Sequence, residues 1–564
     1  MKRDFVRVLR WLLLFVVIDC VAIFLVKPAQ ASTAITANNP TRVQTEFGPV
    51  RGQLSQSGST QVWLGVPYAQ APVGELRWHA PNPPLPWTKE LQANAYGSAC
   101  PQIGFFYGPP PVGKKWGASN VEVFGKPVGN EDCLKLNIWR PSNAVGPMPV
   151  IVFIHGGSNV VGHSADPIYD GEKLALATHA LIVTINYRLG IFGWLAHPAL
   201  EGQDPLTNSG NYAILDIIQA LHFIQSNAVA FGADPRNITV MGQSAGAGNA
   251  YSLMGSPLAQ GLFQKAIVLS GLLERQSTKQ EGYAFTDSFI DQLLIDDHLA
   301  ATQDDAVKYA ASKSLSWKHD YLKSKTTDQL LNAMALHHEF FRAPHGFRDG
   351  SVFPDNAPLD IEEGRIQTVP MIIGTTRDES KLLFPFGIKK SGQEMFGLMR
   401  KSNPDAAPVA QLSDIVSSYL LPDVSPALYN TAHWGISTYL HRKVIKSISI
   451  VSKHNRKVFA YRFDWDDAPQ PWHTVYGACH ACDLPFIFDN FSDNFFSMEY
   501  PQKNKAGREA LSATMMNAIG TFIRTGDPNS PTLHAIWTPW DEEGNNQQSM
   551  VFNATDRGVV LTMQ

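Results

Sequence analysis

The sequence predicts an α/β fold with a central, mostly parallel β-sheet flanked by helices. Two observations carry this prediction: short, continuously apolar runs recur along the chain, and segments with helical spacing separate them. A strand buried on both faces is apolar throughout, and parallel strands are joined by crossovers that are usually helices. With 564 residues, 44% of them hydrophobic and 17% charged, the chain is long enough to bury a large core.

The chain begins with a pattern typical of a secretory signal peptide. Basic residues precede the mostly apolar stretch 11–26, and an A-x-A site follows it at 29–31. Such a stretch of helix spans about 24 Å, which is shorter than the hydrocarbon core of about 30 Å. We therefore expect Met1–Ala31 to be cleaved after Ala31, leaving no membrane span in the mature chain, which is secreted or periplasmic. Retention of the segment as an anchor is the alternative.

From residue 32 to 564 we expect a single domain. Short strands are predicted at 43–54, 61–68 and 134–139, and a helix is predicted at 213–230. The continuous apolar runs predict buried strands at 149–154, 181–186, 265–270, 369–374 and 457–463. The segments 276–341 and 382–450 are helical in spacing and more polar, so we interpret them as insertions that cover the top of the sheet.

The segment 237–248 reads as a strand, a tight turn and the start of a helix. Its centre, Gly242–Gly246, fits the pattern G-x-S-x-G, in which a serine sits on a strained turn between a strand and a helix. Small residues on both sides let the backbone reverse without a clash. Ser244 is therefore the candidate nucleophile.

A glycine-containing loop follows the predicted strand 149–154. In sheets of this kind that loop and the residue after the nucleophile supply backbone amides to an oxyanion hole. The candidate donors are the N–H groups of Gly157, Ser158 and Ala245. The alternative is a plain glycine-rich turn. His155, in the same loop, is interpreted as a brace for the loop.

Several further segments resemble the type-B carboxylesterase family, which includes cholinesterases and bacterial para-nitrobenzyl esterases. They occur in the family's order at 64–69, 72–78, 131–139, 186–190, 231–235, 525–529 and 537–540. The resemblance implies an α/β-hydrolase fold whose helical insertions form a lid over an active-site gorge. It also implies a serine carboxylic-ester hydrolase that acts on a small-molecule ester without a cofactor or a metal. The family also contains non-catalytic adhesion proteins, which are the alternative function.

The resemblance also implies the partners of the serine. The family's acid is a glutamate in a G-x-x-x-D-E segment, matched by 374–379, and its histidine lies in a G-x-x-H segment, matched by 477–480. Glu379 and His480 are thus the expected orienting acid and general base, in the chain order Ser244, Glu379, His480 that this fold uses. Asp378 is the alternative acid.

Some positions depart from the family pattern. Ser158 and Asn159 replace small and aromatic residues in the oxyanion loop, and Ala481 stands where glycine often follows the histidine. The catalytic groups are retained, but the larger polar residues of the loop mean that the family's substrates do not transfer directly to this chain. Trp116 lies where cholinesterases place a choline-binding tryptophan, so cholinesterase-like specificity is a further alternative.

The cysteines and the charge complete the expectations. Cys100 and Cys133 match a family disulfide. Cys479 and Cys482 form C-x-x-C around His480, and a redox or metal role is the alternative for this motif. No second cysteine pair completes a zinc site, and whether the two thiols bond each other stays open. The formal net charge of −4 gives no indication of a nucleic-acid partner.

Overall fold

The computed structural model describes residues 40–564, except 275, 337–345, 356–362, 364–366, 384–390, 417–423 and 542–545. The predicted signal peptide lies outside the described residues. Within the described part of the chain, no helix has the length and apolar character needed to cross a membrane.

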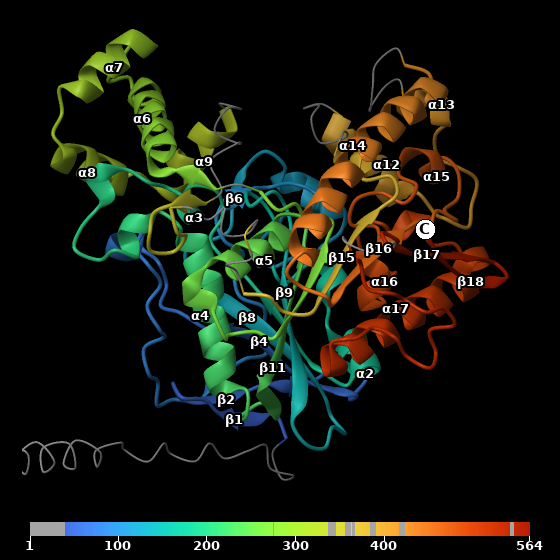
Figure 1. The fold of residues 1–564 in the computed structure, drawn as a ribbon. Helices are drawn as coiled ribbons and strands as arrows, with labels where there is room; N and C mark the ends of the chain where they lie inside the picture. Colours follow the sequence, from blue (N-terminus) through green and yellow to red (C-terminus); the bar gives the residue numbers. More distant parts are fainter. Residues whose placement is uncertain are drawn as a thin grey trace, which may run out of the picture.

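An eleven-stranded sheet runs through the molecule in the order β18-β17-β16-β15-β12-β11-β9-β10-β8-β4-β3, and its centre is visible in Figure 1. Neighbours between β17 and β10 pair in parallel, whereas β18 and the strands from β8 to β3 pair antiparallel. The predicted α/β fold with a mostly parallel sheet is confirmed. The parallel strands are β9 (Met148–Ile154), β10 (Leu181–Ile185), β11 (Ala233–Gln243), β12 (Lys265–Leu269), β15 (Met371–Thr376), β16 (Val458–Phe463) and β17 (Met550–Thr555).

The edges of the sheet differ from the sequence prediction. The segment predicted at 43–54 divides: β3 (Gln53–Leu54) joins the main sheet, whereas β1 (Arg42–Gln44) and β2 (Pro49–Arg51) form a small separate sheet with β5 (Leu91–Gln92). At the other edge, β17 and β18 (Gly558–Met563) form a hairpin that the sequence did not predict. On the β3 side of the sheet, β4 (Thr60–Pro67) and β8 (Lys135–Pro141) are the expected strands.

Helices cover both faces of the sheet, and this explains the continuous apolar runs. Alternate residues of β9 enter different cores: Val150 and Val152 pack with α4 and α5, whereas Ile151 and Phe153 pack with α2, α16 and α17. A strand with two buried faces has no polar side. The helices are α2 (Glu172–Thr178), α4 (Tyr212–Asn227), α5 (Ala245–Gly255), α16 (Leu484–Phe488) and α17 (Lys505–Thr525).

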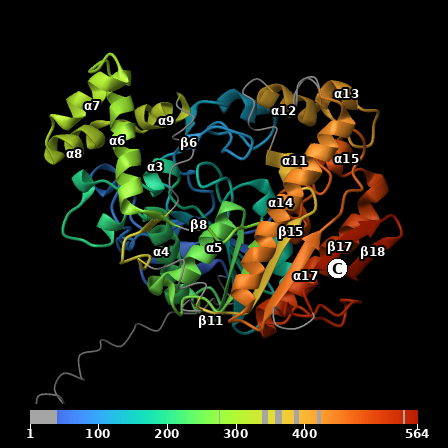
Figure 2. The same ribbon diagram turned by 45° about the horizontal axis from the view of Figure 1, so that its top comes forward.

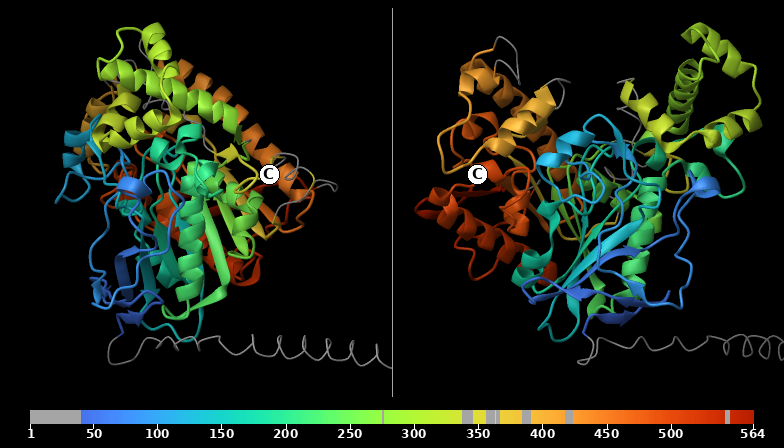
Figure 3. Two further views of the ribbon diagram at one scale, coloured as in Figure 1. Left: turned by 90° about the vertical axis from the view of Figure 1, so that its left-hand side faces the viewer. Right: turned by 180° about the vertical axis from the view of Figure 1, so that it is seen from behind.

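The two predicted insertions are helical. They stand on opposite sides above the sheet in Figure 1, and the turned views in Figures 2 and 3 agree. The first has a hydrophobic core of its own, which includes Phe289 and Leu322 and rests on Trp78. Among the described residues, the helices of the first insertion are α6 (Lys279–Asp296), α7 (Gln303–Ala311), α8 (Leu315–Ser324) and α9 (Thr327–Leu336). Those of the second include α12 (Ser391–Lys401), α13 (Leu412–Ile415) and α14 (Pro426–Ser452).

Candidate active site

Ser244 occupies a strained turn between β11 and α5. Its backbone has φ 56° and ψ −122°, a conformation that residues other than glycine rarely adopt. The flanking glycines are required by close contacts. A Cβ on Gly242 would lie 2.2 Å from the carbonyl oxygen of Gly246, and a Cβ on Gly246 would lie 2.1 Å from that of Ile154. The turn leaves Ser244 partly exposed at the start of a helix.

The loop after β9 passes directly beside this serine. A Cβ on Gly156 would lie 3.0 Å from Ser244 Cβ. The next three residues, 157 to 159, all have positive φ, of 106°, 53° and 58°. This run of positive φ turns the backbone at 157 to 159 immediately after the residue that approaches the serine.

The two residues that depart from the family pattern face different ways. Asn159 is buried, and its side-chain oxygen accepts hydrogen bonds from Tyr187 Oη at 3.2 Å and Asn249 Nδ2 at 2.9 Å. Ser158 is exposed. Asn159 therefore ties the loop to α5, which carries Asn249, and of the two only Ser158 is open to a ligand.

His155 begins this loop and is fully buried. Its ring stacks on Tyr187 with 4.6 Å between centroids, and its Nδ1 lies 2.8 Å from the Gly156 carbonyl oxygen. Burial lowers the pKa of His155 to about 4, so the ring is neutral near pH 7. These contacts agree with the interpretation of His155 as a brace.

Glu379 lies just after β15, buried, with both carboxylate oxygens engaged. Oε1 accepts from Ser270 Oγ and Thr375 Oγ1, each at 2.6 Å, and from the backbone N–H of Thr376 at 2.8 Å. Oε2 contacts His480 Nδ1. Burial alone would raise the pKa of Glu379, but His480 and the donated hydrogen bonds outweigh burial and lower it to about 2.

His480 is buried beside this carboxylate. Burial alone would lower the pKa of His480, but the charge and hydrogen bond of Glu379 dominate and raise it. Because Nδ1 faces Glu379, Nδ1 carries the proton in the neutral ring and Nε2 is an acceptor. The side-chain amide of Gln243, the residue before Ser244, donates to Nε2 at 3.1 Å. Among the described residues, the hydrogen-bond partner of Nε2 is this amide and not Ser244 Oγ.

Asp378 has a different environment from Glu379. Its carboxylate accepts from the backbone N–H of Ala478 at 3.0 Å and from Arg377 Nη2 at 2.8 Å, and its own N–H donates to the Ala478 carbonyl at 2.8 Å. A Cβ on Gly477 would lie 2.5 Å from this carboxylate. Asp378 thus fastens the segment that carries His480 to the end of β15, and the glycine of G-x-x-H makes room for it.

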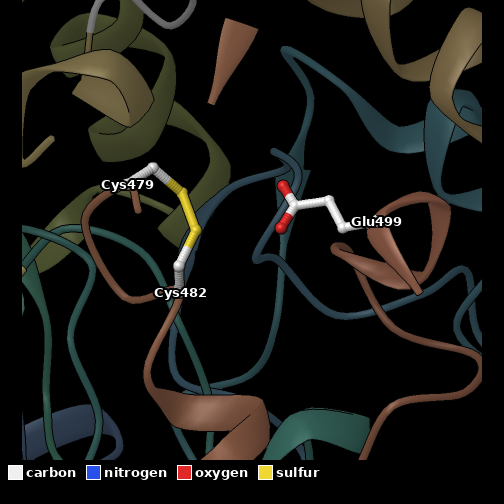
Figure 4. A group of neighbouring side chains, drawn as sticks. All are labelled: Cys479, Cys482 and Glu499. Atoms are coloured by element: carbon white, nitrogen blue, oxygen red, sulfur yellow. A yellow bond between two sulfur atoms is a disulfide. The ribbon is translucent and has the colours of Figure 1, made fainter. Parts of the chain in front are cut away.

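Both cysteine pairs form disulfides. The predicted bond joins Cys100 to Cys133, and the pair whose state the sequence left open, Cys479 and Cys482, is also bonded. The sulfurs of that second pair lie within 4.8 Å of a carboxylate oxygen of Glu499. Figure 4 shows the Glu499 carboxyl group directed toward the disulfide. Metals bind cysteine as thiolate, so sulfurs joined to each other do not offer a metal site.

Trp116 is held by the protein's own groups. Its indole N–H donates to the Phe106 carbonyl at 3.3 Å, Phe396 meets its ring edge to face, and the Arg400 guanidinium lies over the ring at 5.3 Å. One aromatic face is therefore already occupied by a cation.

Sequence reasoning did not find Ser270, Thr375 or Gln243. Each is a single polar residue that belongs to no motif. Only its place in the sheet or beside the nucleophile indicates that it contacts Glu379 or His480. Gln243 adjoins the nucleophile, and Ser270 and Thr375 lie at the ends of adjacent strands, since Leu269 at the end of β12 pairs with Gly374 of β15.

Known proteins resemble this chain over most of its length. Residues 39–562 match the profile of the Carboxylesterase family. The para-nitrobenzyl esterase of Bacillus subtilis is 32% identical over 503 residues, which cover 89% of this chain and 93% of that protein. Fumonisin B1 esterase of Sphingopyxis macrogoltabida is 37% identical over 533 residues, covering 92% and 88%.

Solved structures show the same fold. A structure of PNB esterase superposes with a TM-score of 0.69 at 28% identity and covers 93% of this chain and 97% of that one. A carboxylesterase from Geobacillus stearothermophilus gives a TM-score of 0.68 at 26% identity, covering 93% and 98%. The fold is that of an α/β-hydrolase, its relatives are esterases, and the chain belongs to the type-B carboxylesterase family.

Proposed function

We propose that this carboxylesterase hydrolyses small-molecule esters through an acyl-enzyme, with Ser244 as nucleophile, His480 as general base and acid, and Glu379 as the orienting acid. The observation that carries the proposal is the placement of a carboxylate, an imidazole and a strained serine at one end of the sheet. The carboxylate contacts Nδ1 of His480, and Nε2 is directed to the residue before the serine.

In the first half of the reaction Ser244 Oγ attacks the ester carbonyl carbon and transfers its proton to His480 Nε2. For this transfer Nε2 must exchange the Gln243 amide for the serine hydroxyl, a change of partner that substrate binding would promote; catalytic hydrogen bonds often tighten only in the complex. The imidazolium then protonates the leaving alkoxide, which departs as an alcohol.

In the second half a water molecule attacks the acyl-enzyme while His480 takes one of its protons. The proton then returns to Ser244 Oγ and the carboxylic acid is released. In both halves the negative charge develops on the carbonyl oxygen, and the N–H groups of Gly157, Ser158 and Ala245 are the proposed donors to it. One such donor typically contributes about a hundred- to a thousandfold in rate.

Glu379 stabilises the imidazolium and fixes the ring with Nδ1 protonated. Its three other hydrogen bonds hold the carboxylate in place and keep it ionised. These bonds favour Glu379 over Asp378 as the acid, since Asp378 is already engaged with the backbone of Ala478.

The alcohol and acyl groups are proposed only as a class. The names of the relatives suggest a panel of p-nitrophenyl esters of rising acyl length, a p-nitrobenzyl ester, fumonisin B1 and a choline ester. Arg400 over the Trp116 ring gives no support to choline specificity, so we expect the choline ester to be a poor substrate.

The test compares the wild type with Ser244→Ala on that panel. We expect ester turnover by the wild type and none above background by the variant. Turnover by Ser244→Ala would refute the serine mechanism. No turnover by the wild type on any ester would favour the alternative of a non-catalytic binding protein.

We also propose export with cleavage after Ala31, on the pattern of the first 31 residues. N-terminal sequencing of the protein recovered from periplasm or medium tests this. A mature chain that begins at Met1 would refute it.

A further inference from the structure

The turn that carries His480 has a shape that does not suit its residues. The N–H of Cys482 donates to the carbonyl of Cys479 at 3.0 Å, which closes a four-residue β-turn. Ala481, the third residue of that turn, has φ 65°. Glycine adopts this left-handed conformation freely, whereas the Cβ of an alanine disfavours it. The second residue of the turn is His480, so any relaxation of Ala481 would redirect the imidazole.

The disulfide joins the two ends of this same turn. Cys479 and Cys482 are its first and fourth residues, and their side chains are bonded, as Figure 4 shows. A covalent bond across the ends limits the conformations that the two residues between them can adopt. Both cysteines are buried, so the bond is part of the interior and not an exposed redox pair.

The other contacts of this segment act outside the turn. Asp378 fastens Ala478 on one side, and on the other Tyr461 Oη donates to Asp483 at 2.6 Å. These contacts fix where the turn begins and ends, and the Ala481 carbonyl also accepts from the N–H of Leu484 at 3.1 Å. Within the turn, the hydrogen bond and the disulfide restrain the rotation at Ala481.

We propose that the Cys479–Cys482 disulfide is a positioning element for His480, which holds Ala481 in the left-handed conformation that presents the imidazole to Glu379 and Ser244. This inference rests on the function proposed above. The two cysteines touch no substrate, and no oxidation or reduction takes part in the reaction. The disulfide therefore keeps residue 481 in the left-handed conformation, which a glycine at this position would adopt without strain.

The test first removes the Cys479–Cys482 disulfide and then, with glycine at 481, removes the strain that makes the disulfide necessary. The double variant Cys479→Ala/Cys482→Ala is called the clamp variant. We expect Cys479→Ala/Cys482→Ala to lower kcat about ten-fold, with KM changed less than two-fold. Strain at a left-handed alanine is large enough to lower the population of the active conformation by about this factor once the disulfide is gone. Adding Ala481→Gly to this double variant should restore most of kcat. Ala481→Gly alone, with the disulfide intact, should be close to wild type.

The matched control is Cys100→Ala/Cys133→Ala, which removes the other disulfide. It should lower the melting temperature without lowering kcat. A second readout is the pH profile of kcat/KM: in the clamp variant the apparent pKa of the base should fall, because a redirected imidazole contacts Glu379 less. Rescue by Ala481→Gly should return this pKa to the wild-type value.

Three outcomes would overturn the proposal: wild-type kcat in the clamp variant, a loss of kcat that Ala481→Gly does not rescue, or an equal loss of kcat in the control. If Cys479→Ala/Cys482→Ala does not fold, Cys479→Ser/Cys482→Ser is made with and without Ala481→Gly, and the same loss and rescue of kcat are expected. Ser244→Ala is assayed alongside. Activity in Ser244→Ala refutes the proposed function, whereas an inactive Ser244→Ala with an unaffected clamp variant refutes only this inference.

Discussion

Replacing Glu379 with glutamine exchanges one carboxylate oxygen for an NH2 group, which donates hydrogen bonds instead of accepting them. The structure determines which oxygen is exchanged. Ser270, Thr375 and the Thr376 N–H all donate to Oε1, so the amide keeps its oxygen there. Its NH2 group must then face His480 Nδ1, where Oε2 is now.

A donor at that position inverts the tautomer of His480. Nδ1 becomes the acceptor and Nε2 carries the proton, so the ring cannot take the proton of Ser244. The imidazolium also loses its partner charge. A change of this kind costs about 10⁴-fold in kcat in serine hydrolases that have been so altered, or about 5.5 kcal/mol.

The assay is kcat and KM on a p-nitrophenyl ester, with thermal unfolding to show that the variant folds. Asp378→Asn is the matched control, since it neutralises the adjacent carboxylate; we expect a smaller loss of kcat from it. A Glu379→Gln enzyme that keeps more than a tenth of the wild-type kcat would contradict the role of Glu379 as the orienting acid. A larger loss of kcat from Asp378→Asn would do the same.

Three further predictions concern other buried groups. Gln243→Glu places a carboxylate against His480 Nε2, which should raise the pKa of the base and move the acidic limb of the kcat/KM profile to higher pH; an unmoved limb would contradict this. Glu499→Gln should stabilise the fold at pH 8 and less so near pH 4.5, as unfolding at several pH values would show. Burial raises the folded-state pKa of Glu499, so the wild type loses stability as pH rises above the unfolded pKa of about 4.3; parallel pH curves for both proteins would exclude this effect. Asp216→Asn leaves Arg188 buried without its partner charge and should cost about 3–5 kcal/mol in urea unfolding; a loss below 1 kcal/mol would contradict it.

The central sheet could be predicted because burial on both faces leaves a signature in the sequence. The run 149–154 is apolar throughout, and the structure places β9 at Met148–Ile154. The strand β18 left no such signature, since every residue of Gly558–Met563 is at least partly exposed at the edge of the sheet. Local sequence predicts a strand well only where burial constrains every residue.

The candidate site divides in the same way. The turn at Ser244 could be predicted from five residues, because the close contacts of Gly242 and Gly246 demand glycine. Glu379 and His480 came from family resemblance and not from local pattern. The hydrogen bond from Ser270 to Glu379 spans 109 residues and depends on the pairing of β12 with β15, which no local pattern shows.

The order of the strands also has a consequence for how activity appears during refolding. Ser244 follows β11, Glu379 follows β15, and β12 lies between these two strands in the sheet. The site is therefore complete only after strands far apart in the chain have paired, and such long-range pairing is slow compared with helix formation. Recovery of esterase activity should lag behind recovery of helical circular dichroism. Ester turnover therefore reports when the central strands of the sheet have paired.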